Sequence, residues 1–551
     1  MITEASYQIL CTTGTHADVF AAVGTAGLLH GVQDRVRIRK HGAVFELSGT
    51  GEIRWEELER NLGFRYIKDN EKAVIPTEFA NANRHLDYAA EKAKKEQAKV
   101  AAKQKLEGEA GEIANAIQPD PMFQQYQCLI VLQGDGATNK AQVWLEAKTN
   151  DEWRKIAQDG LSGQGDRQEL GPDSDLVQVF NPQAAKGYAR LKPDGTSRND
   201  KTKESWSDPW QEMMKYRGFF EATVIYLLGS KGENVRILTP LPGDVSFDVY
   251  TSIVRELRAG ARSIFGNGVK VDVLTALRVG ILVIKRTPLG EGKRSRNTIE
   301  GLTVTHYQSM GQAKSVTNME RLGLPDWYPV NTEEEQTRWT QITQEHFDRL
   351  QRLDAAISDQ LALLQQYRKY LQTRGEDSIN ELVTFLREYG ILLMRERGQG
   401  TWMKKQFEEQ HIEEIIMHTS LRGILENPGF QAVAEAIRKS TVSAQALKKN
   451  KQDYREIRYD LLPEIRRKIG LGKSGKLELV SVLSEFVATY NAESARRFEM
   501  DKKNGKSRVD ENDFLEFIGL FDGDADAGLI ANLLCAYATC KAKKIEDGVD
   551  Q

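Results

Sequence analysis

The stretch Pro325-Asp-Trp-Tyr-Pro-Val-Asn-Thr-Glu-Glu-Glu335 divides the sequence into two regions of different character. Two prolines within five residues end any helix or strand, because proline lacks a backbone donor and has a fixed φ. The pair Asn331-Thr332 then offers an N-cap residue, and three glutamates follow in a first turn where the helix dipole favours negative charge. This stretch therefore predicts the start of a helix after a break in the chain.

The sequence after this stretch is typical of helices up to its end. Apolar residues recur every three or four positions, which is the helical period, and clusters of glycine and proline separate further helices. The periodic set is Phe347, Leu350, Leu353, Ile357, Leu361 and Leu364. We therefore predict an all-α helical bundle over residues 331–551.

The sequence before this stretch predicts a mixture of helices and strands. Residues 18–30 indicate a helix with small residues on one side, which permits close packing, and residues 35–39 and 43–47 indicate a hairpin around Lys40-His41-Gly42. A helix with almost no apolar face is expected as a linker near residues 86–111. Further strands are predicted at residues 127–132, 141–145, 219–228, 235–238 and 279–284. The fold class is thus α+β, with a mixed α/β region over residues 1–330.

The overall composition excludes several classes of protein. The net charge of −3 indicates nothing about partners, and four cysteines without zinc-ligand spacing fit a reducing compartment. The apolar run Val271–Ile284 is interrupted by Asp272 and Arg278 and is too short to span a membrane. No signal peptide is recognisable, so we expect a cytoplasmic protein without a membrane partner.

The familiar catalytic motifs are incomplete in this sequence. Gly470-Leu-Gly-Lys-Ser474 resembles the end of a phosphate-binding loop, but Arg467 stands where the motif requires its first glycine. Asp522-Gly-Asp-Ala-Asp526 lacks the glycine and the bidentate glutamate of a calcium loop, so a carboxylate-rich helix start is expected instead. We therefore expect no enzyme activity, no metal and no cofactor.

One catalytic alternative stays open. Asp135 at a predicted hairpin tip, with Glu146 and Lys148 on the next strand, has the pattern of a metal-dependent nuclease. In such enzymes two carboxylates hold Mg²⁺ and the lysine stabilises charge at the attacked phosphate.

Basic residues gather in two places within the first region. Residues 181–203 form a loop-like stretch with six Lys/Arg and two Asp, where cations suit phosphates and amides suit base edges. The predicted duplex-binding residues there are Asn181, Gln183, Lys186, Arg190, Lys192, Arg198, Lys201 and Lys203. A strand leading into a second basic loop offers contacts to a nucleic-acid backbone through Arg278, Lys285, Arg286, Lys293, Arg294 and Arg296.

A third basic cluster lies in the predicted helical bundle. Residues 438–508 hold 18 Lys/Arg and nine Asp/Glu, a local net charge of +9 in a chain of net charge −3. Such an excess repels itself unless an anionic partner screens it. We predict a groove for a single strand of nucleic acid, lined by Arg438, Lys439, Lys448, Lys449, Lys451, Arg455, Arg466, Arg467, Lys468, Arg496 and Arg497.

Two motifs in the first region resemble those of a known family. The segment Asn181-Pro-Gln-Ala-Ala-Lys-Gly-Tyr-Ala-Arg-Leu-Lys-Pro-Asp-Gly195 is similar to the "NP…KGxNRxKxDG" segment in large subunits of type I CRISPR effector complexes (Cascade), closest to the type I-B or Myxan-type branch. Trp210-Gln-Glu-Met-Met-Lys-Tyr-Arg-Gly218 resembles the "W…E…Y…G" helix that follows it. The order of an α/β region before a helical domain, similar to the small subunit of such complexes, also agrees.

The resemblance implies an RNA-guided function without catalysis. The subunit would recognise the PAM beside the target in duplex DNA and would stabilise the R-loop and its displaced strand. Its partners would be guide RNA, target DNA, and the backbone and small subunits of the complex, with a recruited helicase-nuclease or a transposition factor as further partners. Besides the nuclease, a basic helical adaptor that binds an acidic protein stays open as an alternative.

Overall fold

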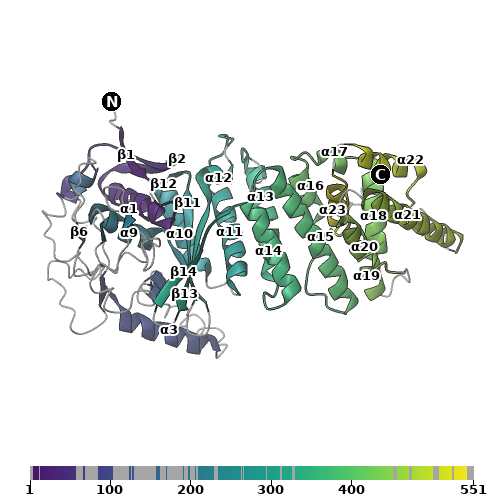
Figure 1. The fold of residues 1–551 in the computed structure, drawn as a ribbon, viewed down its shortest axis with the longest axis horizontal. Helices are drawn as coiled ribbons and strands as arrows, with labels where there is room; N and C mark the ends of the chain where they lie inside the picture. The colour runs from purple at the N-terminus through teal and green to yellow at the C-terminus, as the bar shows by residue number, and fades with distance from the viewer. Residues whose placement is uncertain are drawn as a thin grey trace, which may run out of the picture. The chain divides into compact units, whose positions relative to one another are not determined.

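The computed structural model describes the chain in two compact units (Figure 1). The first unit holds residues 1–268 and 278–326, and the second holds residues 269–277 and 327–551, so the boundary lies close to the one predicted at residue 330. The fold is α+β, as predicted, with sheets in the N-terminal unit and helices in the C-terminal one. The described residues are 4–11, 13–57, 66–68, 85–103, 123–125, 127–128, 155, 157–161, 169–170, 190–191, 197–198, 205–206, 209–228, 234–261, 264, 266–292, 294–310, 313–325, 329–450, 456–470, 475–500, 508–523 and 526–542.

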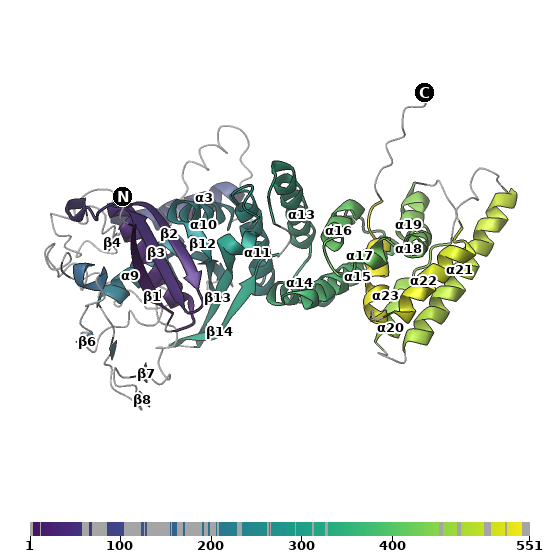
Figure 2. The same cartoon turned by 90° about the horizontal axis from the view of Figure 1, so that it is seen from above.

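An antiparallel sheet of the first unit has the strand order β1-β3-β2-β12, and Figure 2 shows β1, β3 and β2 side by side. Its strands are β1 (Glu4–Leu10), β2 (Asp34–His41), β3 (Val44–Thr50) and β12 (Asp244–Ser246). The predicted hairpin is confirmed as β2 and β3, which pair from His41 and Val44 outward. Gly42 has a φ of +59° in the connecting turn, a conformation that costs glycine least.

A second antiparallel sheet has the order β10-β11-β13-β14, formed by β10 (Val224–Leu228), β11 (Asn234–Pro242), β13 (Ile299–Met310) and β14 (Ala313–Gly323). The strand predicted at residues 235–238 is confirmed. The long hairpin of β13 and β14 was not predicted, although β-branched residues are frequent in Ile299-Glu-Gly-Leu-Thr-Val-Thr305.

The prediction of one strand over residues 219–228 is half wrong. Helix α9 (Pro209–Ala222), the helix expected from the resemblance, includes Phe219 and Phe220, and the strand begins only at Val224. The two rings are buried, and Phe219 contacts Phe20 of helix α1 (His16–Val32) edge to face with centroids 5.8 Å apart. This tertiary contact outweighs the preference of aromatic residues for strands.

Helices α1 and α9 lie unusually close together because glycine occupies their contact. A β-carbon at Gly24 would lie 1.9 Å from the carbonyl oxygen of Met214, and one at Gly218 would lie 1.9 Å from that of Phe20. The small side of α1 that the sequence predicts is therefore the side on which α9 packs.

The strand predicted at residues 279–284 is wrong, because these residues end helix α11 (Gly268–Ile284). A short apolar run alone fits a buried helix as well as a buried strand. Asp272 is fully buried in α11, and one of its carboxylate oxygens forms an ion pair of 2.9 Å with Arg368 of helix α14 (Ser358–Gln372). Helix α10 (Phe247–Ala261) and the short helix α12 (Ser295–Thr298) also belong to the first unit.

Shorter elements are described between residues 55 and 206. The expected linker helix near residues 86–111 is α3 (Tyr88–Lys103). Gln127 and Cys128 are helical, against the strand predicted there, and the rest of that predicted strand pair lies outside the described residues. The remaining elements are the 3₁₀ turn Trp55–Glu57, the parallel pair β4 (Tyr66–Lys68) and β5 (His85–Asp87), and the antiparallel pairs β6 (Glu169–Leu170) with β9 (Ser205–Trp206) and β7 (Arg190–Leu191) with β8 (Ser197–Arg198).

The second unit is built from helices, as predicted, and begins where the sequence indicates. Thr332 caps helix α13 (Glu333–Gln351), and its hydroxyl accepts from Glu335 N while the Glu335 side chain accepts from the cap backbone. Of the periodic apolar residues, Phe347 and Leu350 lie in α13 and Leu361 and Leu364 in α14, whereas Leu353 and Ile357 lie in the connection between these helices. The later helices are α15 (Glu376–Gly398), α16 (Glu409–Ile416), α17 (Arg422–Leu425), α18 (Pro428–Ser440), α19 (Val442–Lys449), α20 (Leu461–Ile469), α21 (Gly475–Met500), α22 (Glu511–Gly519) and α23 (Ala527–Ala538).

Aromatic residues form part of the core of the second unit. Tyr367, Phe385, Tyr389 and Phe407 contact one another at centroid distances of 4.9 to 6.2 Å. His346 is fully buried beside Phe407, and its Nδ1 lies 3.1 Å from the Tyr367 hydroxyl. Burial, together with the nearby His411 and Arg349, lowers the pKa of His346 to about 3.

The glycine contact predicts a steric effect. Gly218→Ala should destabilise the first unit by about 1–3 kcal/mol, because the added methyl group would collide with the backbone of α1. Calorimetry of the full chain measures the shift of the unfolding transition. Gly423→Ala is the control, since a β-carbon there meets nothing within 4 Å. Equal stability of both variants and the wild type would contradict the packing described.

The buried histidine predicts a pH dependence. His346 stays neutral in the folded chain below pH 6.5, whereas the unfolded chain takes up a proton there, so stability falls as the pH drops from 6.5 towards 3. The contribution is at most about 1.4 kcal/mol per pH unit. His346→Phe should reduce the slope of the urea midpoint against pH between 6.5 and 4 and leave it parallel to the wild type above pH 7. An unchanged slope below pH 6.5 would refute this.

Candidate nucleic-acid interface

The first predicted basic segment is described at two of its cations. Arg190 of β7 and Arg198 of β8 are partners in the antiparallel ladder, so the backbone places two arginine positions opposite each other. Asn181, Gln183, Lys186, Lys192, Lys201 and Lys203 lie outside the described residues.

The second predicted cluster is divided between structural and exposed cations. Arg286 donates to the carbonyl of Leu282, to Ser252 and to Glu256, and Arg296 donates to the carbonyl of Leu324 from its Nε at 2.9 Å. These two guanidinium groups therefore stabilise the unit itself. Lys285 and Arg294 are exposed, Arg278 is half-buried on helix α11 and not on the predicted strand, and Lys293 lies outside the described residues.

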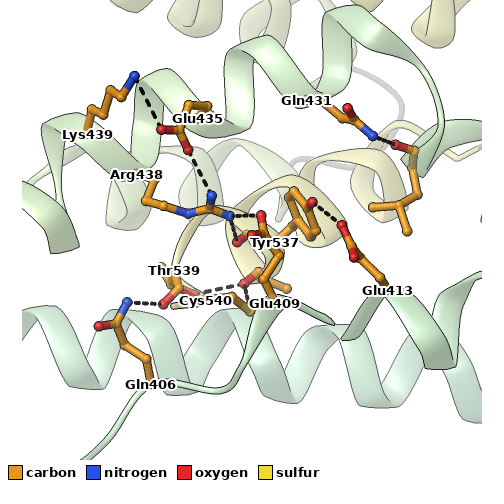
Figure 3. Close-up of polar contacts among 12 residues, drawn as sticks. Gln406, Glu409, Glu413, Gln431, Glu435, Arg438, Lys439, Tyr537, Thr539 and Cys540 are labelled. Carbon is orange, nitrogen blue, oxygen red and sulfur yellow. Dashed lines mark hydrogen bonds and ion pairs between the residues drawn. The ribbon is translucent and has the colours of Figure 1, made fainter. Parts of the chain in front are cut away.

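Arg438 does not belong to the predicted groove. Its residue is only 5% exposed, and its guanidinium lies among helices α16, α18 and α23 (Figure 3). One terminal nitrogen donates to Glu409 at 2.5 Å and to the carbonyl of Tyr537 at 3.0 Å, and the other donates to Glu435 at 2.8 Å. A strand of nucleic acid on the surface could not reach a group that is buried and bonded in this way.

The ion pair of Arg438 is part of a larger polar cluster. Its guanidinium carbon lies 5.3 Å from the centroid of the Tyr537 ring, and the Tyr537 hydroxyl donates to Glu413 at 2.7 Å. Burial opposes the charge on Arg438, but Glu409 and Glu435 outweigh it and raise the pKa of the guanidinium. Burial and the bond to Glu413 raise the pKa of Tyr537. The charge thus stays inside the helical unit, where it links three helices.

Five cations of the third cluster lie on α20 and α21; Arg466, Arg467 and Arg496 are exposed, and Lys468 and Arg497 are half-buried. Arg466 pairs with Glu388 at 3.0 Å, Arg467 with Glu464 at 3.4 Å, and Lys468 with Glu478. The Arg467 side chain is 71% exposed. Arg496 is exposed on α21, and Arg497 pairs with Glu493 at 3.2 Å. Exposed pairs of this kind contribute about 0–1 kcal/mol, so a phosphate can replace the carboxylate at little cost.

The remaining cations of the third cluster lie at the ends of α18 and α19. Lys439 pairs with Glu435 at 3.3 Å, and Lys448 and Lys449 are exposed in the last turn of α19. Lys451 and Arg455 lie outside the described residues. Sequence reasoning missed the aromatic neighbour of this end, Trp402, whose ring centroid lies 4.3 Å from Nζ of Lys449. The signal that could have indicated this residue is a tryptophan in the glycine-containing segment Gly398-Gln-Gly-Thr-Trp-Met403, which connects α15 and α16.

The other candidate sites of the sequence give no catalytic arrangement in the described chain. Asp135, Glu146 and Lys148 lie outside the described residues, and no group of three His, Cys, Asp or Glu suited to a metal occurs among the described ones. Asp526 caps α23 by accepting from Leu529 N, which confirms the expected helix start. Cys535 and Cys540 are buried and free, as expected.

Comparison with known proteins adds no family to these observations. Neither a protein-family model nor a curated protein matches the chain. Within the described part of the chain, no helix has both the length and the apolar character needed to cross a membrane.

The buried guanidinium predicts a large loss of stability. Arg438→Ala should destabilise the helical unit by about 3–5 kcal/mol, because Glu409 would lose its partner in a buried position. Arg467→Ala, which removes an exposed cation, should change stability by less than about 0.5 kcal/mol. Urea unfolding of the full chain measures both. Similar small losses for the two variants would contradict the structural role of Arg438.

Proposed function

We propose that this chain is the non-catalytic large subunit of an RNA-guided type I CRISPR surveillance complex. In this role it recognises the PAM-side DNA duplex and stabilises the R-loop with its displaced strand. Guide pairing supplies sequence specificity, so the subunit contributes a short duplex contact and a positively charged path for one strand. Cleavage or transposition belongs to a recruited partner.

The observation that carries this proposal is the separation of exposed cations from buried ones in the helical unit. Arg466 and Arg467 are exposed on α20 and pair at the surface, and the half-buried Lys468 follows them, whereas Arg438 is buried in the core. A surface held by weak pairs can exchange its carboxylates for phosphates, and the ions released make such binding strongly dependent on salt. The basic excess of residues 438–508 supports the same function.

The first unit supports the duplex contact. Residues 181–195 carry the resemblance to the family, and Arg190 within them is a ladder partner of Arg198. Helix α9, which carries the second resembling motif, follows directly and packs on α1.

The proposal predicts separate effects for the two basic regions. Arg466→Glu, Arg467→Glu and Lys468→Glu combined should shorten the lifetime of the R-loop at least tenfold, because three phosphate contacts are lost and replaced by repulsion. Lys186→Glu, Arg190→Glu and Lys192→Glu combined should weaken target binding before the R-loop opens. Both are measured on the assembled complex by R-loop lifetime and by target binding. Arg422→Glu, an exposed arginine with an i+4 glutamate, is the control.

Assembly itself gives the decisive test. The chain should co-purify with guide RNA and with the backbone and small subunits, and its DNA binding should weaken by orders of magnitude between about 50 and 200 mM salt. A protein that ignores RNA and these subunits and instead binds an acidic protein would refute the proposal. Magnesium-dependent cutting of DNA that Glu146→Ala abolishes would refute it in favour of a nuclease.

A further inference from the structure

Two cations meet on the ring of Trp402 at the end of helix α15. The guanidinium carbon of Arg397 lies 4.7 Å from the ring centroid, and Nζ of Lys449 lies 4.3 Å from it. Cations at this distance are attracted by the negative face of the ring. Trp402 is half-buried, so its contacts with the two cations lie near the surface.

The half-buried Arg397 differs from the buried Arg349 and Arg438 of this unit. Arg349 pairs with Glu345 at 2.6 Å and Arg438 pairs with Glu409, whereas Arg397 has no carboxylate partner among the described residues and donates only to Gln406 at 3.2 Å. Its Nε and Nη1 atoms are buried without a hydrogen-bond partner. Burial lowers the pKa of Arg397, which is the sign of a charge lacking an anion.

An exposed aromatic ring lies against the last turn of α15, next to the residue that follows Arg397. Tyr459 is 42% exposed, and its Cε1 would lie 2.9 Å from a β-carbon at Gly398, the residue that follows Arg397. Glycine thus lets the ring pack against the last turn of α15. Met403 is 75% exposed in the same segment as Trp402, and Lys448 precedes Lys449 on the surface.

We infer that Trp402, Lys448, Lys449 and Tyr459 bind one nucleotide of a single strand, with the phosphate at the lysines and the base stacked on the exposed face of Tyr459. Single-strand binding combines a positive surface for the backbone with aromatic rings for the bases. The phosphate also supplies negative charge near Arg397. Trp402 acts as a positioning residue, because its ring holds Lys449 in place before the strand arrives.

This site rests on the proposed function only in one respect, namely that the bound strand is the displaced strand of the R-loop. Binding at the site itself can be tested without the complex. A 5-iodo-deoxyuridine oligonucleotide mixed with the full chain at low salt should crosslink on irradiation, and mass spectrometry should find the adduct on Tyr459 or Trp402. Oligothymidine titrations should show a roughly tenfold loss of affinity in Tyr459→Ala, because one stacked base is worth about that much. Tyr459→Phe keeps the ring and should keep the affinity.

The cations give an independent measurement. Lys449→Gln should lower the slope of log affinity against log salt by about one, as expected for one phosphate contact. Trp402→Ala should weaken binding in the same direction, since Lys449 loses its support. Arg422→Gln, an exposed arginine that pairs with Glu426, should leave the slope unchanged.

The outcomes separate this site from the proposed function. Crosslinks on other residues, with unchanged affinity in Tyr459→Ala, would overturn the site even if the chain assembles with guide RNA. Crosslinks on Tyr459 in a chain that never assembles with guide RNA would support the site and refute the CRISPR role. Thermal midpoints equal to that of the wild type would show that the variants are folded.

Discussion

The helical unit depends on the buried ion pair of Arg438 and Glu409. This pair joins α18 to α16, and the bond from Arg438 to the carbonyl of Tyr537 adds α23. Next to it, Gln406 donates to the carbonyl of Thr539 at 3.0 Å and Glu409 N donates to the carbonyl of Lys541 at 3.0 Å. These two hydrogen bonds connect residues 539–541 to residues 406–409. Loss of one buried charge would leave the other without compensation, so removing either side chain is expected to be costly.

The same constraint decides what the basic composition means. A net charge of +9 over residues 438–508 suggests one continuous positive surface, yet its members have different environments in the fold. Arg438 neutralises acids in the interior, whereas Arg466 and Arg467 of α20 are exposed and paired weakly. The surface proposed to meet nucleic acid is thus smaller than the sequence suggests. The proposed surface also includes Trp402, which is uncharged and is therefore missed when charges are counted. Its ring contacts Lys449.

In the first unit, local patterns predicted elements whose signals are confined to a few neighbouring residues. The β2–β3 hairpin follows from alternating residues around a glycine turn, and α1 follows from its small and apolar residues. The predictions failed at Phe219–Phe220 and at Val279–Ile284, where apolar runs fit a helix and a strand equally well. There the contact with α1 and the length of α11 decide the outcome.

The sequence by itself determined the α+β class, the break near Pro325–Pro329, the cap of α13 and the existence of basic clusters. These features are local, because proline geometry, capping and charge density act over a few residues. Only the tertiary structure decided which cations are buried, since Glu409 and Arg438 are 29 residues apart and meet through helix packing. It also brought Arg397, Trp402 and Lys449 together, because a cation–ring contact depends on the positions of two helix ends and not on their spacing in the chain.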